Sequence, residues 1–169
     1  EIGIEGASSA AVTFGMQSGA TDGYDDGIDV ITAMPPPNAP GAYFYVPEPE
    51  ISYTEDFRDI TDEKEWFLVV QTAENAVELS WNLGGALMAG KYLTIYRVND
   101  EHLPVGGTAS NMALSTSATV PAEAVHFYVI RYASDLAVDL AFRQGWNLIS
   151  LPIQPDDPAV EAVFAEVSV

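Results

Sequence analysis

The stretch EWFLVVQT, residues 65–72, decides the fold. Trp66, Leu68 and Val70 alternate along it with other residues, so they share one face of an extended strand. Its aromatic and β-branched side chains favour a strand over a helix, and it has the length of one strand. Three more segments share this character, and they are AVELSW at 76–81, YLTIYRV at 92–98 and VHFYVIRY at 125–132. The sequence therefore predicts an all-β fold.

The segments around these runs extend the same pattern. Turn signals such as TAEN, NLGG and VGG separate the runs at the spacing of an antiparallel β-sandwich of the immunoglobulin or jelly-roll type. Weaker strands are predicted at EIGIE (1–5), AVTFG (11–15), IDVIT (28–32), AYFYV (42–46) and LAVDLAF (136–142). We therefore expect one β-sandwich domain over residues 1–142.

The last part of the chain differs from the rest. In PDDPAVEAVFAEV, residues 155–167, Asp157 is placed as an N-cap and Pro158 as the first helical residue. Apolar residues follow at helical spacing, which predicts a short C-terminal helix.

Composition limits the classes of function. The chain of 169 residues has no cysteine, so disulfides and thiolate chemistry are excluded. Its net charge of -19 argues against nucleic acid and against anionic membranes, because both require a cationic face. The hydrophobic content of 48% indicates a packed globular domain, and no apolar run is long enough for a membrane-spanning helix.

Four carboxylates crowd into the stretch ATDGYDDGIDV, residues 20–30, as Asp22, Asp25, Asp26 and Asp29. Such carboxylates repel one another unless backbone donors or a cation separate them. A calcium ion would need about six to eight oxygen ligands, and these residues supply several. The spacing is not that of an EF-hand, so the stretch is either a calcium site or an acidic turn held by side-chain-to-backbone bonds.

Other candidate sites give weaker signals. A second acidic stretch, residues 53–65, mixes carboxylates with Arg58 and Lys64 and is predicted to be a solvated loop. His126 lies in an apolar strand and is predicted to be packed or hydrogen-bonded, and His102 lies in a surface turn. No nucleophile or cofactor motif is present, so we predict that the chain is not an enzyme. The aromatic residues Tyr43, Phe44 and Tyr45 of AYFYV and the three tryptophans leave sugar binding as an alternative.

Several segments together resemble a known family. They are FGMQSGATDGYDDGIDVITAMPPP (14–37), WFLVV (66–70), VELSWNL (77–83) and GWNLISLPIQP (145–155). Their order resembles β-sandwich modules of the immunoglobulin or fibronectin type in large secreted bacterial and archaeal cell-surface proteins. The resemblance implies an extracellular, non-catalytic spacer or adhesive unit.

The resemblance also suggests how such a chain assembles. Residues 143–169 resemble the opening of a following module, which is expected to pack on this domain or to be donated to a neighbour. We therefore predict a structural subunit of a cell-surface filament, tube or surface layer that pairs with copies of itself by strand donation. The predicted interface residues are Ile2, Ile4, Trp146, Leu148, Val163 and Phe164. The alternative is a carbohydrate-binding or spacer module of a larger secreted enzyme or adhesin.

Overall fold

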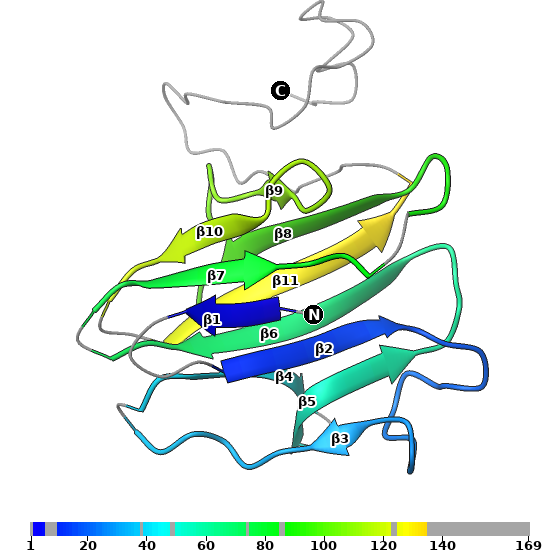
Figure 1. The fold of residues 1–169 in the computed structure, drawn as a ribbon, viewed down its shortest axis with the longest axis horizontal. Coiled ribbons are helices and arrows are strands. Elements are labelled where there is room, and N and C mark those ends of the chain that lie inside the picture. Colours follow the sequence, from blue (N-terminus) through cyan, green and yellow to red (C-terminus); the bar gives the residue numbers. More distant parts are fainter. Residues whose placement is uncertain are drawn as a thin grey trace, which may run out of the picture.

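The computed structural model describes residues 2–5, 10–37, 39–47, 50–73, 75–84, 87–122 and 125–134, with the backbone alone for residues 2–5. This part of the chain forms β-strands and contains no helix, so the all-β prediction is confirmed (Figure 1). Within it, no helix could cross a membrane. The predicted C-terminal helix, the predicted strand at 136–142 and the candidate interface residues Trp146, Leu148, Val163 and Phe164 lie outside the described residues.

The strands follow the apolar runs of the sequence. They are β1 (Ile2–Glu5), β2 (Ala10–Met16), β3 (Val30–Ile31), β4 (Gly41–Pro47), β5 (Glu50–Arg58), β6 (Lys64–Gln71), β7 (Val77–Trp81), β8 (Tyr92–Val98), β9 (Ser110–Asn111), β10 (Ser117–Val120) and β11 (Val125–Ala133).

The described strands make one mixed sheet with the order β10-β7-β1-β2-β5-β4-β6-β11-β8-β9, and β3 pairs with β5 beside this path. Every pair is antiparallel except β2–β5, in which Thr13 is aligned with Glu55 in parallel. The long crossover from β2 through β3 and β4 permits this parallel pair. The prediction of a purely antiparallel sheet is therefore wrong at this one pair, and two separate sandwich sheets are not confirmed.

Two strands change partners along their length and so curl the sheet. Residues 10–12 of β2 pair with β1, whereas its residues 13–16 pair with β5. In β5, Tyr53 is opposite Phe44 of β4, and the residues after it pair with β2. The sheet therefore folds over on itself, with β7, β1 and β2 in front of β11 and β6 (Figure 1).

One apolar core fills the space inside the curl. Trp66, Leu68 and Val70, which the sequence predicts on one face of β6, are all at most 1% exposed. They belong to one cluster with Leu79 and Trp81 of β7, on the other side of the curl. Burying side chains of this size contributes roughly 1.5–3 kcal/mol each, so the core favours the curled form over an open sheet.

Strand β1 lies in the interior of the sheet. Gly3 is aligned with Ser80 of β7 on one side and with Ala11 of β2 on the other. Of the described strands, only β1 hydrogen-bonds to both β7 and β2. The candidate interface residues Ile2 and Ile4 are therefore placed at register positions between two strands of their own chain.

Trp81 fastens β7 to the segment between β9 and β10. Its indole Nε1 donates to the carbonyl oxygen of Met112 at 3.1 Å and to that of Ser115 at 2.7 Å. Because the indole is nearly buried, these bonds satisfy its donor inside the core.

Candidate functional site

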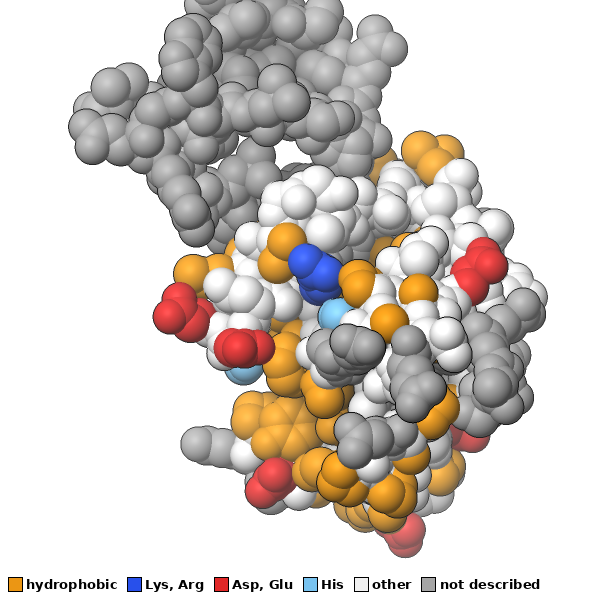
Figure 2. Space-filling view, turned by 90° about the vertical axis from the view of Figure 1, so that its left-hand side faces the viewer, with side chains coloured by type: hydrophobic (Ala, Val, Ile, Leu, Met, Phe, Trp, Pro, Cys, Tyr) orange, Lys and Arg blue, Asp and Glu red, His pale blue; other side chains and the backbone are white. Residues whose placement is uncertain are grey.

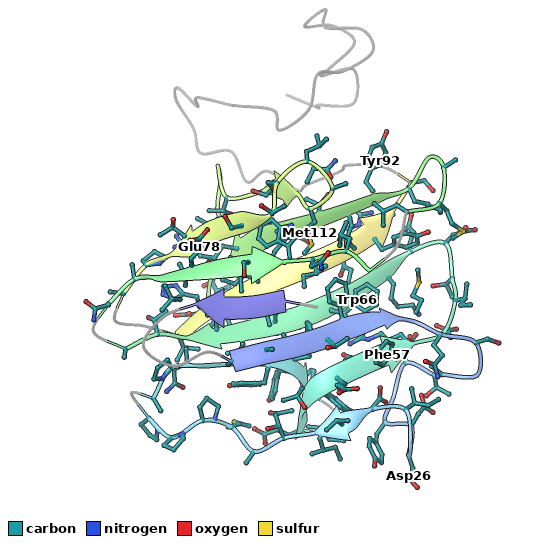
Figure 3. The ribbon with its side chains drawn as sticks, in the orientation of Figure 1. Asp26, Phe57, Trp66, Glu78, Tyr92 and Met112 are labelled. Carbon is teal, nitrogen blue, oxygen red and sulfur yellow. The ribbon has the colours of Figure 1, made fainter. Side chains whose placement is uncertain are left out.

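The acidic turn, residues 20–29, connects β2 to β3 and is held by its own carboxylates. Asp25 accepts hydrogen bonds from the backbone N–H and from the hydroxyl of Thr21. Asp26 lies at the tip of the turn, far from the core, and its only described partner is the hydroxyl of Tyr24 (Figure 3). The bond to Asp25 is a local side-chain-to-backbone bond, but its donor lies four residues before the carboxylate, so it is not an Asx-turn, in which the donor lies two residues after it.

Asp29 joins the acidic turn to the sheet. Its side chain is 7% exposed, and each carboxylate oxygen accepts one backbone N–H. Oδ2 accepts from Asp25 at 2.8 Å, and Oδ1 accepts from Phe57 of β5 at 2.8 Å. A buried carboxylate with both oxygens bonded is stable without a metal ion, because charge-assisted bonds offset the cost of its burial.

Asp22 reaches in the other direction, to a buried cation. The ammonium of Lys64 at the start of β6 lies 2.5 Å from Asp22 and 2.5 Å from Asp59. Burial alone would lower the pKa of Lys64, but the hydrogen bonds that it donates to the carboxylates of Asp22 and Asp59 outweigh burial and raise the pKa. The hydrogen bond from Lys64 in turn lowers the pKa of Asp59.

Arg58 adds a second cation beside Lys64. Its guanidinium donates to both oxygens of Asp56, at 3.1 Å and 3.0 Å, and to the carbonyl oxygen of Glu65 at 2.7 Å. It also lies over the ring of Trp66, 5.8 Å from the ring centre. The planar guanidinium therefore covers the edge of the core while it joins β5 to β6.

The second acidic stretch collects most of the positive charge of the described chain. Besides Arg58 and Lys64, Lys91 pairs with Asp62, and Arg131 approaches Glu63 and Glu65 at 3.9 Å and 3.7 Å. We call residues 56–65 with these four cations the charge hub. The prediction of a solvated loop is wrong here, because the stretch forms β5, a turn and the start of β6.

The charge hub could not be found by searching for a motif. Its partners come from positions far apart in the sequence, because Lys91 directly precedes β8 and Arg131 lies on β11, where it is aligned with Glu65. The sequence feature that could have indicated the charge hub is the small number of cations, because the chain has only six Lys and Arg residues for 25 Asp and Glu residues. Cations this rare are expected at the places where carboxylates are most crowded.

The four candidate calcium ligands point to different protein donors rather than to one centre. Within the described ranges, no group of three or more His, Asp or Glu side chains is placed to hold a metal ion. Asp22 bonds Lys64, and Asp25 and Asp29 bond backbone N–H groups. Calcium binding by Asp22, Asp25, Asp26 and Asp29 stays a prediction, and the observed bonds are those of the acidic turn.

An aromatic surface lies beside the charge hub, on the outer face of β4, β6, β11 and β8. The strand register places five rings on this face, opposite to the core, and they are Tyr43, Tyr45, Phe67, Tyr96 and Phe127. We call these residues the aromatic face. The rings of Phe67 and Phe127 stack with centres 5.9 Å apart, and His102 covers Phe67 with its ring centre at 4.7 Å.

A shallow hollow of about 270 Å³ joins the aromatic face to the charge hub. Tyr45, Phe67 and Val129 line one part of it, and Asp22, Arg58 and Glu65 line the other. Figure 2 shows the other end of the molecule, where hydrophobic side chains gather over the lower part of the view with acidic ones at its margin. The hollow therefore combines ring surfaces with charged hydrogen-bonding groups, which is a common composition of ligand sites.

The remaining histidine has a backbone partner. Nε2 of His126 lies 3.0 Å from the carbonyl oxygen of Pro121, and burial lowers its pKa.

Comparisons with protein-family models, with curated proteins and with solved structures gave no match to this chain.

Asp29→Asn tests how the acidic turn is held. Asparagine keeps one acceptor but turns an N–H₂ group toward a backbone N–H, so a buried donor loses its partner. We expect the free energy of unfolding to fall by about 1–3 kcal/mol in urea titrations. Asp26→Asn is the control, because the side chain of Asp26 is exposed. This substitution should change the free energy of unfolding by less than about 0.5 kcal/mol. A melting temperature that rises with calcium, and no longer rises in Asp25→Asn/Asp26→Asn, would instead identify a metal site.

Asp59→Asn tests the charge hub through pH. The folded pKa of Asp59 lies below its ordinary value of 3.8, so the carboxylate stabilises the fold at pH values above that value. This contribution is lost as the pH falls through the folded pKa. The variant should therefore melt below the wild type at pH 7, and the difference should close below about pH 4.

Asp62→Asn is the matched control, because Asp62 pairs with Lys91 through a side chain that is 93% exposed. Its effect at pH 7 should be much smaller. If both substitutions lower the melting temperature equally, the pair of Lys64 with Asp59 stabilises the fold no more than the exposed pair of Lys91 with Asp62.

Proposed function

We propose that this chain is a non-catalytic β-sandwich module of an extracellular surface structure, and that it assembles with copies of itself by exchanging β1. The observation that carries the proposal is the position of β1, which fills the slot between β7 and β2. The family resemblance supports the extracellular setting. The partner changes of β2 and β5 support a sandwich, since such corners join the layers of sandwiches.

Exchange of β1 keeps every bond that the single chain makes. A β1 strand from a second copy would meet the same partners, with Gly3 against Ser80 and Ala11. The balance between the single chain, which holds its own β1, and the exchanged assembly is then set by protein concentration and by the segment that links β1 to β2, as in domain swapping. Because each copy donates one strand and receives another, contacts that do not close into a ring extend into a filament.

One edge of the described sheet, formed by β10, has the features of a protected edge. Strand β10 ends the path of the described sheet and pairs only with β7. It has only four residues, and short edge strands reduce uncontrolled pairing between molecules. The net charge of -19 also keeps copies apart, so assembly is expected to be favoured by salt.

Mixed single-cysteine variants test the exchange, because the chain has no cysteine of its own. Gly3→Cys and Ser80→Cys place one thiol on each of two directly aligned residues. Aligned residues of antiparallel strands have the Cα separation that a disulfide needs. When the two variants are mixed at high concentration and oxidised, we expect a mixed disulfide dimer on a non-reducing gel.

Gly3→Cys mixed with Thr119→Cys is the control, since Thr119 is aligned with Glu78 and not with β1. If β1 is exchanged, the mixture of Gly3→Cys with Ser80→Cys should give more mixed disulfide dimer than the mixture of Gly3→Cys with Thr119→Cys. If both mixtures give the same yield, and the intact chain stays monomeric in light scattering at high concentration and high salt, β1 exchange is wrong.

Carbohydrate binding is the second candidate function, and the hollow beside the aromatic face favours it. Aromatic rings stack on the apolar faces of sugars, and the charged groups of Asp22, Arg58 and Glu65 can bond hydroxyls. The ring of Tyr45 is half-buried at the hollow. No deep cleft is required for a polysaccharide, which lies along a surface.

Tyr45→Ala tests this candidate in pull-downs with insoluble polysaccharides such as cellulose and chitin. One stacking ring is worth about 0.5–1.5 kcal/mol, so retention should weaken by up to about tenfold. Tyr24→Ala removes an exposed ring that stacks on Tyr53, away from the hollow, and should bind as the wild type does. An intact chain that no polysaccharide retains would leave only the structural module.

A further inference from the structure

An apolar groove of about 640 Å³ lies at the end of the molecule opposite to the acidic turn. Its walls come from the loop after β7 and from the segment after β9, and Trp81 and Met112 lie at its floor. Figure 3 shows Met112 and Tyr92 together at this end. Because Trp81 donates to the carbonyl oxygens of Met112 and Ser115, the floor is tied to both walls.

The rim of this groove exposes large apolar side chains. Leu114 is 80% exposed and Met88 is 52% exposed, and both line the groove. Leu83 and Leu87 lie between them and the core. Among the described residues that line the groove, Lys91 is the only charged one. Such a surface favours an apolar, uncharged occupant. A carboxylate in the groove would lose hydration, and Lys91 is the one cation of the described lining that it could pair with.

The described part of the chain ends beside a residue of the groove lining. The ammonium of Lys91 lies 2.7 Å from the hydroxyl of Ser134, which is the last described residue. Residues 135–169 follow from that point. Among them, residues 144–155 carry no charged side chain and include the apolar run WNLISLPI at 146–153. An uncharged apolar segment therefore begins a short distance along the chain from an uncharged apolar groove.

We propose that the groove binds residues 146–153 of the same chain. The connecting residues 135–145 span up to about 3.3 Å each when extended, so they can reach any part of the groove from Ser134. A short tether gives the segment an effective concentration of about millimolar, which favours it over a second copy at micromolar concentration. The proposal assigns a docking site to the C-terminal segment and does not depend on the exchange of β1.

A disulfide trap tests this docking in the full-length chain. Met88→Cys with Leu148→Cys introduces the only two thiols of the protein, one in the groove and one in the segment. Under mild oxidation we expect a monomeric cross-linked product, mapped by peptide mass spectrometry. The control pair is Ile60→Cys with Leu148→Cys. Ile60 is 59% exposed and lies near Asp62, whose carbonyl oxygen also accepts from Lys91, so both pairs start near Ser134.

The two pairs should differ at least tenfold in the rate of monomer cross-linking if the segment occupies the groove. Adding Leu114→Glu to the first pair should slow its cross-linking toward the control rate. The circular dichroism spectrum should not change, because Leu114 is 80% exposed and lies outside the core cluster, so the fold itself should persist. Equal rates for the two pairs would refute the docking, and so would a product that is mainly a cross-linked dimer, which would assign the groove to a second copy.

Discussion

The fold depends on one interior strand of only four residues. Among the described strands, β1 alone connects the pair β7–β10 to the rest of the sheet by hydrogen bonds. Without it, that pair would be attached by the side chains of Leu79, Trp81 and Val120 in the core, and the backbone groups of two strands would lose their partners. The core and the backbone hydrogen bonds of β1 therefore form together. The curl of the sheet buries the apolar side chains, and it also brings β7 to the position where β1 can pair with it.

Electrostatics provides the second constraint, and it acts locally. Most carboxylates of this chain remain at the surface, where solvent and salt screen their repulsion. Four of the scarce cations are instead gathered around residues 56–65, and Asp29 fastens the acidic turn to β5 by backbone donors. Charge thus fixes one hairpin and the turn beside it, next to the aromatic face. The two candidate functions make use of different parts of this arrangement, the strand slot and the ring surface.

The strands and the core follow from periodicity, but the partners of the strands do not. Alternation identifies Trp66, Leu68 and Val70 as core residues, and the structure confirms them. The parallel pair of β2 with β5 could not be predicted, because it depends on where the crossover places a strand and not on any local pattern. The acidic turn was one of two alternatives for Asp22 to Asp29, since spacing alone does not show which donors face a carboxylate. The charge hub needed long-range contacts, such as Lys64 with Asp22, which only the fold supplies.

The interior position of β1 also determines the order in which this molecule can be completed. Ile2 is aligned with Val12 and with Trp81, so β1 can pair early with β2 but meets its second partner only once the chain has been made as far as β7. Pairings over such sequence separations close large loops and are slow to form. The pair of β1 with β7 therefore forms later than the pair of β1 with β2, and until then one edge of β1 stays open for a time that is governed by folding kinetics rather than by the stability of the finished sheet.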